Sequence, residues 1–147
     1  MPMTTYESKI KTIAKPQEFA YKFLSNFSFL QNIKDLPMEG QEKLNNSLKD
    51  LEWDEDSVKF RVTGLGQMGL RIIQREPFQT IKMETEDSPV KANAWIQFVS
   101  VSENETKMRI TLKADIPLAL RVMVGSKIEK GINSLADAIA KGLNEMQ

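Results

Sequence analysis

The sequence contains no cysteine and no histidine among its 147 residues. The lack of cysteine excludes disulfides, thiolate metal ligands and a thiol nucleophile. The lack of histidine excludes Ser-His-Asp triads, histidine metal sites and acid–base catalysis by imidazole. The residues therefore predict no metal site, no cofactor and no catalytic residue.

An excess of one charge and a long apolar run are also missing. Lysine plus arginine and aspartate plus glutamate number 20 each, so the net charge is zero and does not oppose self-association. Nucleic-acid-binding proteins usually carry a basic excess, so we expect no nucleic-acid partner. No segment approaches the ~20 apolar residues that span a bilayer, and residues 1–7 lack an apolar signal core. We therefore expect a cytoplasmic protein without a membrane span.

What is present is the composition of a globular domain. Hydrophobic residues make up 41% of the chain, which is enough for one core. No internal repeat, low-complexity run or linker divides the sequence. We expect residues 1–147 to form a single domain.

Alternating apolar and polar residues predict that most of the chain forms strands. The clearest alternation places Val58, Phe60 and Val62 between charged or polar neighbours. Turn-forming clusters, such as 54–57, 87–89 and 103–105, separate the segments. The expected strands are residues 4–14, 58–62, 67–76, 78–86, 92–102 and 107–116.

Two short helices are expected after the first strand. Pro16 suits the first helical position and Glu18 the first turn, while Phe19, Phe23 and Phe27 recur every four residues. A second short helix or turn is expected over residues 29–36. The pattern of residues 38–51 leaves two alternatives, a helix or a strand that begins near Leu48 and runs to Trp53.

A long amphipathic helix is expected at the C-terminal end, beginning after Pro117. Its apolar face is predicted to grip the sheet through Ile128, Ile132, Leu135 and Ile139. Ser126 and Glu129 have capping-box spacing, which predicts a break at Gly125-Ser126 after a short first piece, 118–124. That piece would then act as a movable lip. Gly131 lies off the apolar face and could permit close approach of the helix to the sheet, or passage of a ligand.

The order of elements predicts an α+β fold in which a curved antiparallel sheet wraps around the last helix. The segments Lys15-Pro16-Gln17-Glu18, Thr106 to Leu112 and Asp115-Ile116-Pro117 resemble the START-like superfamily, which includes polyketide cyclases, lipid-transfer domains and the birch-pollen allergen family. The sequence is most similar to its small, uncharacterised bacterial members. The resemblance implies a helix-grip fold of about seven strands in the order β-α-α-β6-α. It also implies a cavity that binds a sterol-like molecule, lipid, polyketide or similar apolar molecule.

The candidate cavity residues are those expected to point between the sheet and the last helix. Most are apolar, and Gln97 is included although both faces of its strand carry large apolar groups. The candidates are Phe23, Phe60, Met68, Leu70, Ile72, Met83, Trp95, Gln97, Met108, Ile110, Leu112, Met123, Ile128, Ile132 and Leu135.

Each of these features also has a purely structural interpretation. Methionine is a common core filler, and Trp53 and Trp95 could simply pack. Period-two counting places Arg71 and Arg109 on the solvent face of their strands. The acidic cluster at 52–56 matches no calcium loop and is interpreted as a turn.

Three functions remain open from the sequence. The first is non-catalytic binding or carriage of a small apolar ligand in the cavity. The second is a cyclase or dehydratase reaction that uses a cavity carboxylate or tyrosine, with Glu84 as the nearest carboxylate if its strand has the opposite register. The third is a protein-binding module of the chaperone-activator type, which would expose an apolar patch.

Overall fold

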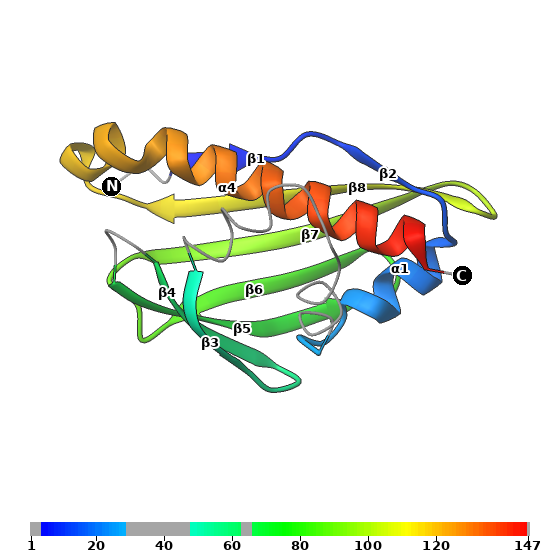
Figure 1. Cartoon of the computed structure of the whole chain (residues 1–147), viewed down its shortest axis with the longest axis horizontal. Coiled ribbons are helices and arrows are strands. Elements are labelled where there is room, and N and C mark those ends of the chain that lie inside the picture. Colours follow the sequence, from blue (N-terminus) through cyan, green and yellow to red (C-terminus); the bar gives the residue numbers. More distant parts are fainter. Residues whose placement is uncertain (1–3, 29–47, 63–65, 147) are drawn as a thin grey trace.

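The computed structural model describes residues 4–28, 48–62 and 66–146, with the side chains of 48–51 and 62 left aside. The expected α+β architecture is confirmed, because one curved antiparallel sheet lies against a long C-terminal helix (Figure 1). The sheet has eight strands in the order β1-β8-β7-β6-β5-β4-β3, and β2 also pairs with β8. The elements are β1 (Thr4–Glu7), β2 (Lys11–Ile13), α1 (Gln17–Leu24), β3 (Leu48–Trp53), β4 (Ser57–Val62), β5 (Gly66–Glu76), β6 (Thr80–Glu86), β7 (Lys91–Ser102), β8 (Glu105–Asp115) and α4 (Leu118–Glu145).

The N-terminal strand expected over residues 4–14 is divided into β1 and β2, so that expectation was wrong. Glu7 pairs with Thr111, but Lys11 pairs with Met108, so the N-terminal segment contains one residue more than β8 between these two pairs. An extra residue reverses which side chains face the core. Ser8 fills the gap in the ladder, because its hydroxyl accepts a hydrogen bond from the backbone N–H of Ile110.

The uncertain stretch before Trp53 ends in a strand, β3, as one of the two alternatives predicted. The second short helix, expected over 29–36, lies outside the described residues. The turn after β3 is organised by Asp54, whose carboxylate accepts hydrogen bonds from the N–H groups of Asp56 and Ser57. These bonds, that of Asp56 above all, lower the pKa of the Asp54 carboxyl below its ordinary value. The Asp54 carboxylate therefore stabilises the turn after β3.

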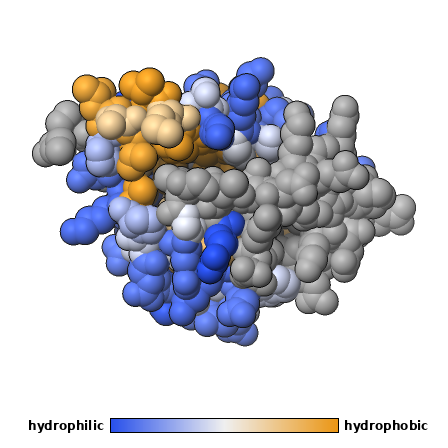
Figure 2. Space-filling view, turned by 60° about the vertical axis from the view of Figure 1, so that its left-hand side comes forward, coloured by the Kyte–Doolittle hydropathy of each residue, from blue (hydrophilic) through white to orange (hydrophobic). Residues whose placement is uncertain are grey.

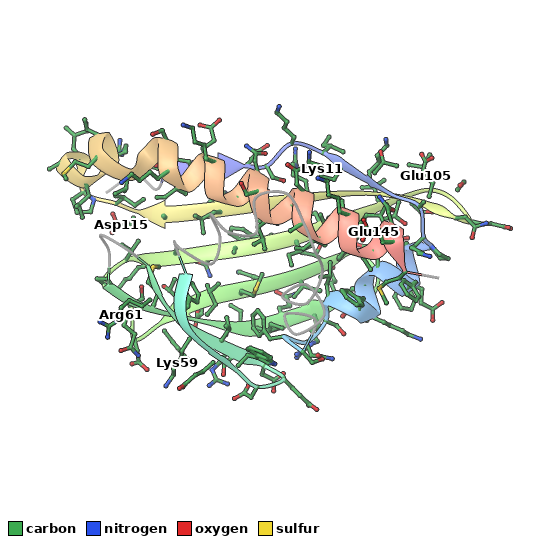
Figure 3. The ribbon with its side chains drawn as sticks, viewed as in Figure 1. Lys11, Lys59, Arg61, Glu105, Asp115 and Glu145 are labelled. Atoms are coloured by element: carbon green, nitrogen blue, oxygen red, sulfur yellow. The ribbon has the colours of Figure 1, made fainter. Side chains whose placement is uncertain are left out.

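The two faces of the sheet differ in chemistry. On β4 to β8 the side chains directed at α4 are apolar or uncharged over most of each strand, as in the buried, alternating residues of β7 from Ala92 to Phe98. The opposite face carries the charged partners of the alternation. Lys59 and Arg61 of β4 illustrate this, since both point away from α4 (Figure 3). Alternation alone therefore defines an inner and an outer face.

The helix α4 is continuous over 28 residues, so the break expected at Gly125-Ser126 was wrong. A single glycine costs a helix interior about 1 kcal/mol, which is too little to interrupt a helix whose following turns are packed. The capping-box residues Ser126 and Glu129 are exposed on its surface. No helix in the described part of the chain is long and apolar enough to cross a membrane.

The C-terminal half of α4 is the half that is firmly packed. Its buried residues begin at Ala136, and Ile139 and Leu143 are fully buried in the core with Ile13 and Leu24. Of the four predicted gripping residues, Ile139 is fully buried and the other three pack only partly. The grip is therefore displaced toward the C-terminal end.

Polar side chains of α4 fasten the same half to the N-terminal segment. The Asn144 side chain accepts a hydrogen bond from the backbone N–H of Ala14 and donates one to the backbone carbonyl of Thr12. The side-chain oxygen of Asn133 accepts a hydrogen bond from the backbone N–H of Lys9, and Asp137 forms an ion pair with Lys11. Since these partners lie within β2 and just before and after it, the helix and the edge of the sheet hold each other in place.

Two leucines of α4 test this asymmetry. We expect Leu143→Ala, at a side chain that is 0% exposed, to lower the free energy of unfolding by about 2–5 kcal/mol because it leaves a cavity in the core. We expect Leu118→Ala, at a side chain that is 68% exposed, to change it by less than about 0.5 kcal/mol. Urea denaturation measures both, and comparable losses would contradict the packing described.

Candidate ligand-binding site

Half-buried apolar side chains lie on the inner face of the sheet and on α4. The buried residues form two clusters, a large one beside α1 and a small one containing Val90, Ala92, Ala114 and Ile116. Half-buried residues border the clusters, and Leu112 packs against both.

Most of the predicted cavity residues lie on this inner side. Four of them, on strands β5, β6 and β8, are buried and belong to the large cluster: Ile72, Met83, Met108 and Ile110. The others are half-buried against one or both clusters: Phe23, Phe60, Met68, Leu70, Leu112, Ile128, Ile132 and Leu135. The half-buried set is the candidate contact surface for a ligand.

Two predicted residues lie on the opposite face, so their expected place in the cavity was wrong. Trp95 and Gln97 point outward from β7, because Ala94, Ile96 and Phe98 take the inner positions. The ammonium groups of Lys82 and Lys113 lie 5.5 and 5.8 Å from the centre of the Trp95 ring. The side-chain oxygen of Gln97 accepts a 2.9 Å hydrogen bond from the Thr111 hydroxyl. Trp95 and Gln97 line a mostly polar outer hollow of about 250 Å³ with Gln74, Glu76, Thr80 and Lys82.

Met123 was also placed wrongly, since its side chain is 70% exposed on α4. It belongs to an apolar patch at the start of the helix, which Figure 2 shows at one end of the molecule. We call Leu118, Val122 and Met123 the α4 patch. Val122 is 82% exposed, so the patch is surface and not cavity lining.

Arg71 and Arg109 lie on the outer face, as period-two counting predicted. Arg71 pairs with Glu86 and Arg109 with Glu7, each at 3.2 Å. Glu84 is exposed and stands opposite Arg71 in the ladder, so it is not a carboxylate of the interior. Among the described inward positions of β4 to β8 there is no aspartate or glutamate.

Tyr6 is a residue of the interior that the sequence interpretation missed. It pairs with Leu112 and packs against the small cluster, while its hydroxyl is buried without a hydrogen-bond partner among the described residues. An unpaired buried hydroxyl costs about 1–3 kcal/mol. The nearest atom to a Cβ built on Gly125 of α4 would be this hydroxyl oxygen, at 3.4 Å. Alternation over residues 4–14 could have placed Tyr6 inward, but only the fold brings Gly125 beside it.

Arg121 is a second unusual group at the same end. One of its terminal nitrogens donates to the carbonyl of Ile116, a member of the small cluster, and its Nε is buried without a partner in the described chain. No acidic residue lies in the first turn of α4. Gly131, by contrast, faces open space, so the close approach suggested for it was wrong.

The unpaired hydroxyl of Tyr6 predicts an unusual response to mutation. We expect Tyr6→Phe to leave the free energy of unfolding unchanged or to raise it by up to about 1 kcal/mol, because no hydrogen bond is lost. Thr106→Val is the matched comparison: the buried Thr106 hydroxyl donates to the carbonyl of Lys15 at 2.8 Å, so its loss should cost about 1–3 kcal/mol. Equal losses in chemical denaturation would show that the Tyr6 hydroxyl has a partner.

Comparison with known proteins supports the fold assignment. No protein-family model matches the chain, and no curated protein sequence is significantly similar to it. Among solved structures, the chain is similar to a norcoclaurine synthase point mutant from Thalictrum flavum in complex with a transition-state analogue. The two chains are 14% identical with a TM-score of 0.72, and the match covers 99% of this chain and 98% of the synthase chain. The Mll3558 protein from Rhizobium loti is 12% identical with a TM-score of 0.63, covering 96% and 97%. A START superfamily protein from Mycobacterium smegmatis is 13% identical with a TM-score of 0.56, covering 98% and 95%. The chain therefore has the START-like helix-grip fold.

Proposed function

We propose that this protein binds or carries a small apolar molecule between the concave face of the sheet and the N-terminal half of α4. The observation that carries the proposal is the continuous set of half-buried apolar side chains there, including Met68, Leu112 and Ile128. Ligand sites of this kind are mostly apolar, with a few polar groups that set orientation. The similar solved structures include one named for an enzyme and one named as a START protein, so fold alone leaves catalysis open.

The chemistry of the described interior favours binding over a carboxylate-based reaction. A general base must lie within hydrogen-bond reach of the proton that it removes. The described inward positions of β4 to β8 offer no carboxylate, and Glu84 lies on the other face. The candidate ligands are therefore lipids, sterol-like molecules, polyketides or similar apolar compounds, bound without chemical change.

The proposal is tested with the neutral fluorescent probe N-phenyl-1-naphthylamine. We expect the wild type to bind it, and Leu112→Trp to weaken binding by at least about tenfold, or ~1.4 kcal/mol, because the larger ring occupies the space beneath α4. Val99→Trp adds the same ring at an exposed position on β7 and should leave the dissociation constant unchanged.

Val122→Ser separates interior binding from adsorption to the α4 patch. It should leave the affinity for the probe unchanged, since Val122 is exposed. Loss of binding in Val122→Ser with retention in Leu112→Trp would overturn the proposal. Circular dichroism and thermal unfolding establish that each variant is folded.

A second candidate function is supported by the α4 patch. Monomeric proteins seldom expose grouped apolar side chains without a use for them, and this end of the helix is apolar on all sides apart from Arg121. The exposed Lys127 and Lys130 follow the patch on the same helix. We infer a protein partner with an apolar surface bordered by acidic residues.

The partner hypothesis predicts a pattern opposite to that of the ligand hypothesis. The wild-type protein should capture a partner from the native host, the Leu112→Trp variant should also capture it, and the Val122→Ser variant should not. The purified partner should show the same differences in binding to the three proteins. We expect a loss of at least about tenfold in affinity, typical of removing an anchoring apolar side chain. No difference between the two variants would contradict a role for the patch.

A further inference from the structure

We propose that Tyr6 and Arg121 bind the anionic head of the ligand, so that the molecule carried is an apolar chain ending in a carboxylate. This inference rests on the proposed binding function and specifies its ligand class. It starts from two polar groups at the same end of the interior, each with a buried atom that has no hydrogen-bond partner in the described chain: the Tyr6 hydroxyl and the Arg121 Nε.

The two groups border the same apolar cluster. Tyr6 packs against the cluster of Val90, Ala92, Ala114 and Ile116, and the Arg121 guanidinium holds the carbonyl of Ile116 at 3.3 Å. The neighbouring residue Leu120 packs against this cluster as well. An apolar chain lying along the half-buried inner residues would therefore have its end beside both groups.

The chemistry of the pair selects an anion. A guanidinium has N–H donors and no acceptor, and a tyrosine hydroxyl can also donate. Buried N–H groups are normally paired, yet the Arg121 Nε has no partner among the described residues, none of the described salt bridges involves Arg121, and the first turn of α4 has no acidic residue. A carboxylate satisfies both donors at once, and hydrogen bonds between charged groups are stronger than those between neutral ones.

Gly125 lets the Tyr6 hydroxyl approach α4 closely. It follows Arg121 by one helical turn on α4, and a Cβ at this position would lie 3.4 Å from the Tyr6 oxygen. Alanine would be favoured over glycine in a continuous helix, so glycine has a cost at this position, and the close approach of the Tyr6 hydroxyl would explain it.

The test is displacement of N-phenyl-1-naphthylamine by two competitors of equal chain length, decanoate and decan-1-ol. We expect Arg121→Gln to weaken decanoate binding by about 10- to 100-fold, because a charged hydrogen bond is lost, and decan-1-ol binding by less than about threefold. Tyr6→Phe should weaken both by about three- to tenfold. Lys127→Gln, which removes an exposed cation from the same helix, should change neither.

Glycine variants provide an independent reading if Arg121→Gln fails to fold. Gly125→Ala should weaken binding of both competitors, whereas Gly131→Ala, whose added Cβ meets nothing within 4 Å, should not. If the wild type binds the probe but decanoate affinity is unchanged in Arg121→Gln and Tyr6→Phe, the anionic-head inference is overturned and the binding function stands. If the wild type does not bind the probe at all, the binding function itself fails.

Discussion

The packing of the C-terminal half of α4 on the edge of the sheet is the interaction on which the rest of the structure depends. Ile139 and Leu143 join α4 to the core, and Asn144 binds backbone groups on both sides of Ile13. This end therefore combines full apolar burial with directional hydrogen bonds. The helix is rigid, so fixing one end determines where its other end lies over the sheet.

The opposite half of α4 has a different role because it is only partly packed. Ile128 and Ile132 touch the sheet without being fully buried, and the α4 patch (Leu118, Val122, Met123) faces away from it. Half-buried apolar residues give up part of the stability that closer packing would provide. Under the proposed binding function, the same surface is the one that an apolar ligand would cover.

The bulge between β1 and β2 links the two ends. By adding one residue relative to β8, it lets Tyr6 face the interior near the start of α4 while Ile13 faces the core near its end. Without the extra residue, an even-numbered and an odd-numbered side chain of one strand could not both point inward. Ser8 makes the irregularity tolerable by supplying a hydroxyl where the ladder lacks a backbone acceptor.

The sequence by itself determined the element order, the long terminal helix and the inner face of most strands, because these follow from local periodicity. Val58 and Phe60, or Met108 and Ile110, alternate with polar residues, and such alternation specifies a face without reference to the rest of the chain. Trp95 escaped this rule because both faces of β7 are apolar, so only pairing with Lys82 and Thr111 assigned it to the outside. The continuity of α4 through Gly125 and the close approach of Tyr6 to Gly125 were decided by tertiary structure alone. Residues this far apart in sequence are brought together by the register of β1 on β8 and by the docking of α4, and neither leaves a local signal.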